Sequence, residues 1–177
     1  MLELKAQLTI EYLASFITFI GLIIFIYFTY SANIPGFIEE VKKEDVRSKA
    51  YQLSEILVND PGHPMDWDDC GSVCIKRIGL SDENFNKTNL ISLDKVQELH
   101  TQCNNPGGFD DIKKFLGLNK SFSIYVFNIS QSDGKRDGLC ECSSPELIKT
   151  AINTTVRRIT ALNNNGRLEL VEIIVQM

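Results

Sequence analysis

The apolar residues of this chain are concentrated near its beginning. Residues 8–30 read LTIEYLASFITFIGLIIFIYFTY. As a helix this segment would be roughly 35 Å long, which is enough to cross the hydrocarbon core of a bilayer. Glu11 is the one charged residue within it. Because a carboxylate in lipid costs at least a few kcal/mol, the pattern predicts a membrane-spanning helix whose acidic residue needs a partner or a shallow position.

A second helical segment follows the apolar run. Residues 31–36 include Pro35, which lacks a backbone donor, and Gly36, so we expect a kink or a short break there. Beyond it, apolar residues recur at helical spacing with charges on the opposite face, and this half should lie against a head domain. The apolar positions are Phe37, Val41, Ala50, Leu53 and Leu57. We therefore predict one long kinked helix over residues 7–58.

The remainder of the chain has the pattern of an α+β head. Turn formers at residues 59–64 end the long helix, and short helices are expected after Ser92 and over residues 110–118. Residues 121–128 and 138–143 have strand character, and residues 149–162 and 167–176 flank the hairpin signal Asn-Asn-Asn-Gly. The predicted fold is a long N-terminal helix packed on an antiparallel β-sheet head, in the form of a meander, over residues 59–177.

Composition and charge exclude several classes of function. The 177 residues carry a net charge of −5, and Lys and Arg are scattered, so no basic surface for nucleic acid is indicated. Neither His63 nor His100 stands in a nucleophile motif, and no glycine-rich phosphate loop is present. We expect no enzyme activity and no cofactor.

Five cysteines follow the apolar run, where an exported domain would meet oxidising surroundings. We expect disulfides among them, with at least one link from the loop that holds the first two cysteines to the later strand. One thiol must stay free or join chains, and the pairing is left open. Zinc, with the two histidines as further ligands, is the alternative. The cysteines are Cys70, Cys74, Cys103, Cys140 and Cys142.

Four N-x-S/T sequences also follow the apolar run and are candidate glycosylation sites. A site within a strand could be modified only if its side chain faces solvent. The four asparagines are Asn86, Asn119, Asn128 and Asn153. A separate acidic loop could supply oxygen ligands to calcium, but without the spacing of an EF-hand a solvated loop is the better interpretation. Its carboxylates are Asp66, Asp68 and Asp69.

A secretory signal has a basic start, a short apolar stretch and then a cleavage site with small residues. Here only the short segment MLELKA precedes the apolar run, and no such cleavage site follows that run. A cut between Ala6 and Gln7 would remove residues 1–6 and leave the apolar helix on the mature protein. It would also create a positive amine on Gln7, one helical turn from Glu11. Amine and carboxylate, from one chain or from neighbours, would compensate each other in the low dielectric of packed helices.

The segment Gln7-Leu8-Thr9-Ile10-Glu11-Tyr12-Leu13 resembles the start of archaeal type IV pilin-like proteins with a class III signal peptide. The resemblance implies that a prepilin peptidase cleaves before Gln7 and that Glu11 serves subunit docking. Two features depart from that pattern, namely a very short leader with the single basic residue Lys5, and Ala6 where glycine is commoner. A weaker resemblance to the external heads of such proteins is carried by residues 61–62, Trp67 and residues 78–80 and 93–96.

Taken together, the resemblance implies a structural subunit of an archaeal type IV pilus-like filament. The size of the head favours a minor or specialised subunit, with a major subunit as the alternative. Its partners would be other pilin subunits, the prepilin peptidase and, before assembly, the membrane. The rival is a membrane-anchored adhesin or solute-binding head that does not polymerise. A plain anchor with a shallow Glu11, or a buried core helix, would account for the apolar run without any filament.

Overall fold

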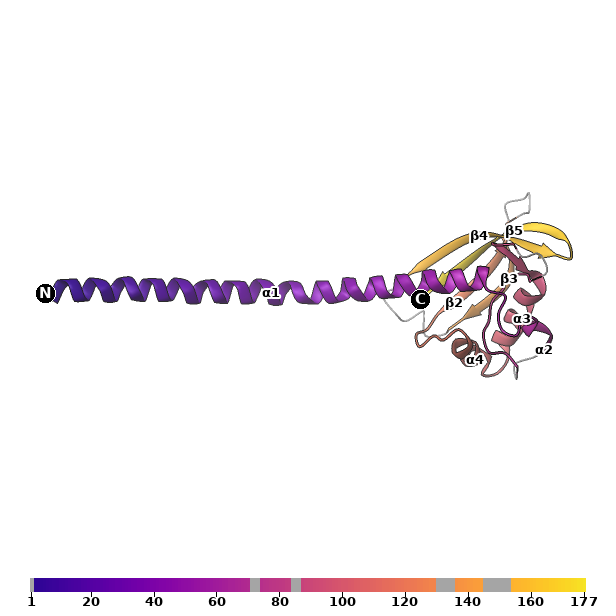
Figure 1. Cartoon of the computed structure of the whole chain (residues 1–177), viewed down its shortest axis with the longest axis horizontal. Coiled ribbons are helices and arrows are strands. Elements are labelled where there is room, and N and C mark those ends of the chain that lie inside the picture. The colour runs from indigo at the N-terminus through magenta and orange to yellow at the C-terminus, as the bar shows by residue number, and fades with distance from the viewer. Residues whose placement is uncertain (1, 71–73, 84–86, 130–135, 145–153) are drawn as a thin grey trace. The chain divides into compact units, whose positions relative to one another are not determined.

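A computed structural model describes the chain except for residues 1, 71–73, 84–86, 130–135 and 145–153, and the side chains of residues 2–9 and 70. The chain divides into two units, residues 1–42 and residues 43–177. The first unit is helical throughout its described part. The second contains the last turns of the same helix together with all the strands (Figure 1).

The first helix, α1, runs from Leu2 to Asn59 and contains Pro35. The helix is continuous through residues 31–36, so the predicted short break is wrong, whereas the predicted kink stays a prediction. Pro35 removes one intrahelical donor, at a cost of about 3 kcal/mol in a helix interior, but the turns on both sides keep their regular bonds. The carbonyl that loses its usual donor is that of Ser31, four residues before Pro35, whereas the Asn33 amide donates to the Thr29 carbonyl at 2.8 Å. The predicted end of the helix, at the turn formers after residue 58, is confirmed.

The second unit is an α+β head built on one five-stranded sheet with the order β1-β4-β5-β2-β3. Its strands are β1 (Leu90–Ser92), β2 (Ser123–Asn128), β3 (Asp137–Ser143), β4 (Thr155–Asn164) and β5 (Arg167–Gln176). The predicted strands in the 121–128 and 138–143 segments and the final hairpin are confirmed. The part of the predicted strand over residues 149–153 lies outside the described residues.

The sheet is mixed, so the predicted antiparallel meander is wrong in two respects. β1 pairs with β4 in parallel, whereas the other three pairings are antiparallel. The last strand, β5, inserts between β4 and β2 instead of lying at an edge. β1 has only three residues, which is too short to show a period, and it leads directly into a helix. Such a strand gives no signal in the sequence.

The hairpin turn between β4 and β5 follows from local chemistry. Asn165 and Gly166 have φ angles of 50° and 89°, which is the left-handed pair that a two-residue turn requires. The Gly166 N–H donates to the Asn163 side-chain oxygen at 2.8 Å. The turn therefore fixes the register of ten strand pairs from Thr155 opposite Gln176 to Asn164 opposite Arg167.

Helices cover one face of this sheet. They are the last turns of α1, then α3 (Leu93–Asn104) and α4 (Gly108–Phe115), while α2 (Trp67–Cys70) lies in the preceding connection. Ala50, Leu53 and Leu57 are buried in the core as predicted, whereas Phe37 and Val41 are exposed. Ser92 is at the N-cap position of α3 as expected, but its side chain makes no capping bond.

Trp67 closes the end of the core next to the turn that follows α1. It is fully buried, and its Nε1 donates to the Gly79 carbonyl at 2.8 Å. Two glycines allow this packing, since a Cβ on Gly62 would lie 2.4 Å from the Trp67 ring and a Cβ on Gly79 would lie 2.0 Å from the Asp60 carbonyl oxygen. The segments after α1 can therefore approach each other only as bare backbone.

This close approach predicts different responses at two glycines. Gly79→Ala should lower the free energy of unfolding of the head by about 1–3 kcal/mol or more, because the clash is with backbone that cannot rotate away. Gly138→Ala is the matched control, since its added Cβ would meet nothing nearer than 3.9 Å. Urea unfolding of the full chain in detergent measures both. Equal stability of the two variants would contradict the packing described.

Candidate assembly helix and the cross-linked head

The apolar part of α1 is exposed along its described length. The described part of α1, Ile10–Asn59, is long and apolar enough to span a membrane. Its most apolar stretch of 18 residues has no buried residue. Large side chains such as Phe16, Phe19 and Phe25 are each more than half exposed. The alternative of a buried core helix is therefore wrong. A continuous apolar surface of this length requires a covering of lipid or protein.

Three hydroxyl side chains of this segment are hydrogen-bonded within the helix. The hydroxyls of Ser15, Thr18 and Thr29 each donate to the backbone carbonyl four residues earlier, at 2.9 Å. A polar group that is already hydrogen-bonded costs much less to remove from water than a free one. These residues therefore let α1 enter an apolar environment without a partner for each hydroxyl.

Glu11 differs from these residues because its carboxylate carries a charge. It is the only charged residue between Ile10 and Ile38, and it is exposed on the helix surface. The backbone of Gln7 belongs to the same helix, one turn earlier, but its side chain and that of Ala6 lie outside the described part. The pairing of the Gln7 amine with Glu11, and the cut that would create that amine, stay predictions.

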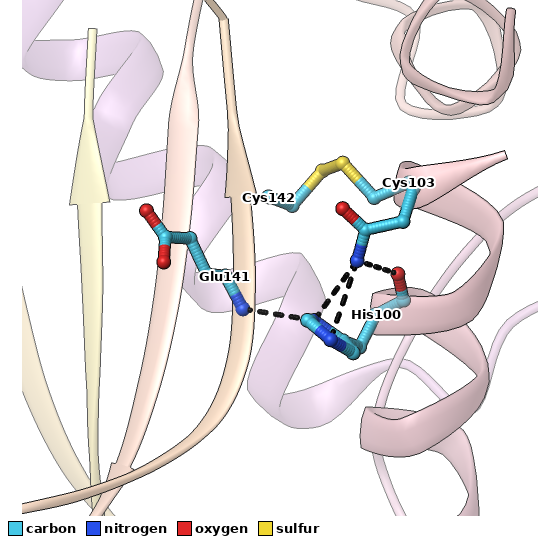
Figure 2. Close-up of a disulfide and its surroundings, with 5 residues drawn as sticks. His100, Cys103, Glu141 and Cys142 are labelled. Atoms are coloured by element: carbon cyan, nitrogen blue, oxygen red, sulfur yellow. Dashed lines mark hydrogen bonds between the residues drawn. A yellow bond between two sulfur atoms is a disulfide. The ribbon is translucent and has the colours of Figure 1, made fainter. Parts of the chain in front are cut away.

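The head is cross-linked between α3 and the sheet. Cys103 in α3 and Cys142 in β3 form a disulfide, with their Cα atoms 5.6 Å apart (Figure 2). The prediction of a disulfide is thus confirmed for this pair. The predicted link from the loop of Cys70 and Cys74 to the later strand is wrong, since Cys142 pairs with Cys103 and Cys140 is a free thiol. Cys74 is also disulfide-bonded.

His100 joins α3 to the outer side of β3, an edge strand of the sheet. The Glu141 backbone N–H points away from β2 and donates to His100 Nδ1 at 3.2 Å (Figure 2). Asn104, one turn later, donates to the His100 carbonyl at 2.9 Å and contacts the imidazole. An unpaired strand edge is a template for pairing with another chain, so His100 and the nearby disulfide together cover part of this edge.

Cys140 is the buried thiol beside this cross-link. It lies two residues before Cys142 in β3 and is 2% exposed. Burial, with a smaller contribution from Glu141, raises the pKa of this thiol to about 12. The thiolate is the reactive form of cysteine, so Cys140 is inert while the head is folded.

The other candidate ligands are not gathered into one site. His63 forms a backbone bridge with Arg77, far along the chain from His100 on α3. Asp66 and Asp69 are exposed, and partial burial raises the pKa of Asp68. Within the described residues, no three His, Cys, Asp or Glu side chains are grouped as metal ligands would be.

Lys95 is an interior cation that the sequence pattern did not reveal. It is 1% exposed, and its ammonium donates to the carbonyls of Pro61 at 2.9 Å and Ser81 at 3.2 Å and pairs with Glu83. A buried charge is tolerated when oxygen acceptors surround it in this way. Lys95 thereby fixes two loops that follow α1, a role that a lysine in an amphipathic helix does not indicate from the sequence alone.

The sheet is tied to the helix by another ionic contact. Arg158 in β4 donates from Nε to the Ser54 hydroxyl at 2.9 Å and pairs with Glu55, both in the last part of α1. Lys120 forms a second tie, with Asp45 at 2.9 Å. Hydrogen bonds from Lys120 and then Lys49 lower the pKa of Asp45. These contacts attach the end of α1 firmly to the head.

The candidate glycosylation sites fall into two groups. Asn119 is exposed in the connection between α4 and β2, whereas Asn128 lies in β2, is 9% exposed and donates its amide to Glu169. Asn86 and Asn153 lie outside the described residues. The sequence predicted that Asn128 could be modified only if its side chain faced solvent. In the structure Asn128 lies opposite Val171 of the hydrophobic core.

Comparison with known proteins finds a relative in an archaeon. No protein-family model matches the chain, and no solved structure matches it. An uncharacterized protein of Archaeoglobus fulgidus is 35% identical over 127 residues, which cover 63% of this chain. The chain spans 64% of that relative's length. The likeness is thus to an archaeal protein whose description names no activity, ligand or partner.

Burial of Cys140 predicts its reactivity. Folding favours the protonated thiol, so this group's contribution to stability is present below about pH 9 and is lost as the pH rises from 9.0 towards about 12. At pH 8, iodoacetamide should leave Cys140 unmodified in the folded protein and modify it rapidly in urea. Mass spectrometry of the Cys140 peptide measures this, and rapid labelling without denaturant would contradict the buried position.

The disulfide predicts a separate effect on stability. Replacing both Cys103 and Cys142 by serine opens a loop of 39 residues and should lower the free energy of unfolding by roughly 2–4 kcal/mol. Urea unfolding under oxidising conditions measures the difference. Reductant also opens the disulfide of Cys74, so wild-type protein treated with reductant should unfold at a urea concentration no higher than that of the double variant. An unchanged midpoint in both samples would show that the cross-link does not form.

Proposed function

We propose that this chain is a subunit, minor or specialised, of an archaeal type IV pilus-like surface filament. It enters the membrane through α1, is cleaved by a prepilin peptidase between Ala6 and Gln7, and then assembles through the same helix. The observation that carries the proposal is the exposed apolar surface of α1 with Glu11 as its single charge. The Gln7–Leu13 resemblance supports it.

The chemistry of assembly follows from the change of surroundings of α1. Leaving lipid for a bundle of like helices keeps the apolar side chains away from water, so hydrophobic burial does not oppose the transfer. The charge of Glu11 decides the arrangement instead. At low dielectric an uncompensated carboxylate is costly, and a copy whose new amine reaches Glu11 removes that cost. The pair therefore selects one axial register.

The head supports a position outside the membrane. Its Cys103–Cys142 disulfide is of the kind that persists in oxidising compartments. Residues 43–177 contain their own core and sheet, so the head can remain folded whether α1 lies in lipid or among other helices. The polar ties of Arg158 and Lys120 to α1 connect the head to the helix that assembles.

A substitution at Glu11 tests the docking role. Glu11→Ala should reduce incorporation into sheared filaments by more than about tenfold, since loss of even 1.4 kcal/mol changes an equilibrium tenfold. Membrane insertion should be retained, because the helix becomes more apolar. Quantitative immunoblotting of the filament and membrane fractions measures both.

Glu40→Ala is the matched control, as it removes an exposed acid from the same helix outside the apolar segment. This variant should enter filaments normally. Incorporation of Glu11→Ala at the level of Glu40→Ala would contradict the docking role. Confinement of the wild-type chain to membranes would favour the rival, an anchored head that does not polymerise.

A further inference from the structure

Two of the four N-x-S/T sequences have described asparagines, and these differ in accessibility. Asn128 is 9% exposed in β2 and its amide is held by Glu169, whereas Asn119 is exposed in the connection between α4 and β2. Among the described residues the Asn119 amide has no hydrogen-bond partner. We propose that Asn119 carries an N-linked saccharide and that Asn128 does not.

The connection presents Asn119 in a fixed position. Gly117, two residues after the end of α4, has a φ of 66°. The N–H groups of Gly117 and Leu118 donate to the backbone carbonyls of Lys114 and Lys113, each at 2.9 Å. This pair of bonds is a Schellman motif, which ends a helix and turns the chain away from its axis. The residue that follows is Asn119, so its side chain is displayed directly after a rigid helix end.

The far side of the same connection is anchored as well. Lys120, the middle residue of the Asn-Lys-Ser sequence, pairs with Asp45 at 2.9 Å. Phe122 is fully buried and stacks on Phe109, with ring centroids 4.8 Å apart. Asn119 is therefore the accessible residue of a segment that is held on both sides, and its modification would not require the head to unfold.

A groove of about 180 Å³ lies beside Asn119. Its walls combine apolar and polar groups, which suits a saccharide, because the C–H face of a sugar packs on aliphatic side chains while its hydroxyls bond to polar ones. The Leu53 and Ile56 side chains are apolar, and Lys49 and Gln52 supply hydrogen-bonding groups. All four belong to the last part of α1.

In the modification a C–N bond replaces a C–O bond, and one proton moves from the amide to a base. The Asn119 amide nitrogen bonds to the anomeric carbon of a saccharide, and the bond from that carbon to the phosphate of a lipid-linked donor breaks with its electron pair. The amide loses one proton to a base of the transferring enzyme. Ser121 supplies the hydroxyl at the third position of the acceptor sequence. No oxidant or reductant is involved.

A saccharide at Asn119 would restrict how heads can pack. A bulky, hydrated group beside the groove would keep that side of the head in solvent, so contacts between heads would have to use other surfaces. This consequence rests on the proposed function, whereas the modification itself requires only that the head faces a compartment with a transferring enzyme.

Peptide mapping of protein purified from the cells that produce it tests the assignment. The peptide containing Asn119 should carry a saccharide mass, and the peptide containing Asn128 should have its unmodified mass. Ser121→Ala should lose the modification at Asn119, whereas Ser121→Thr, which keeps the acceptor hydroxyl, should retain it.

An unmodified Asn119 peptide, a modified Asn128 peptide, or a Ser121→Ala variant with the wild-type mass would overturn the proposal. The membrane and sheared-filament fractions are mapped separately. A saccharide at Asn119 in protein that is absent from filaments would uphold this inference while counting against the filament proposal, so the two failures are distinguishable.

Discussion

The structure depends on one constraint, which is that the apolar surface of α1 cannot remain in water. Residues 10–38 present a helix whose Ser15, Thr18 and Thr29 hydroxyls donate to their own helix and whose side chains are exposed in the single chain. Such a segment satisfies the requirements for a position in lipid or in a bundle of similar helices. The apolar side chains of α1 must therefore be covered by lipid or by other protein chains.

The two edge strands of the head sheet, unlike α1, are contacted by other parts of the same chain. At one edge, the segment before β1 bonds to it, since Asp82 N–H donates to the Leu90 carbonyl at 3.0 Å and Ser92 N–H to the Leu80 carbonyl at 2.9 Å. At the other edge, α3 is joined to β3 by the disulfide and by His100 (Figure 2). The contacts at one edge and the partial cover at the other limit strand pairing between heads, which favours association through α1.

Local patterns in the sequence predicted the elements well and their arrangement less well. The Asn-Asn-Asn-Gly turn fixed the final hairpin because its backbone angles exclude most other residues. Pro35 was misleading, since the loss of a single donor is tolerated where the turns on both sides are intact. The disulfide partner of Cys142 was not predictable, because Cys103 reaches it only through the packing of α3 on the sheet. Lys95 gave no signal, since two of its acceptors are backbone carbonyls and the third, Glu83, lies 12 residues away in the chain.

The central claim is that proteolysis gives Glu11 a cationic partner by creating an amine on Gln7. N-terminal sequencing of the mature protein from its native membrane or filament tests this claim most directly. The account predicts that the first residue is Gln7, so that the mature chain begins one helical turn before Glu11. A functional protein that still begins at Met1 would contradict it and would leave α1 as an ordinary membrane anchor.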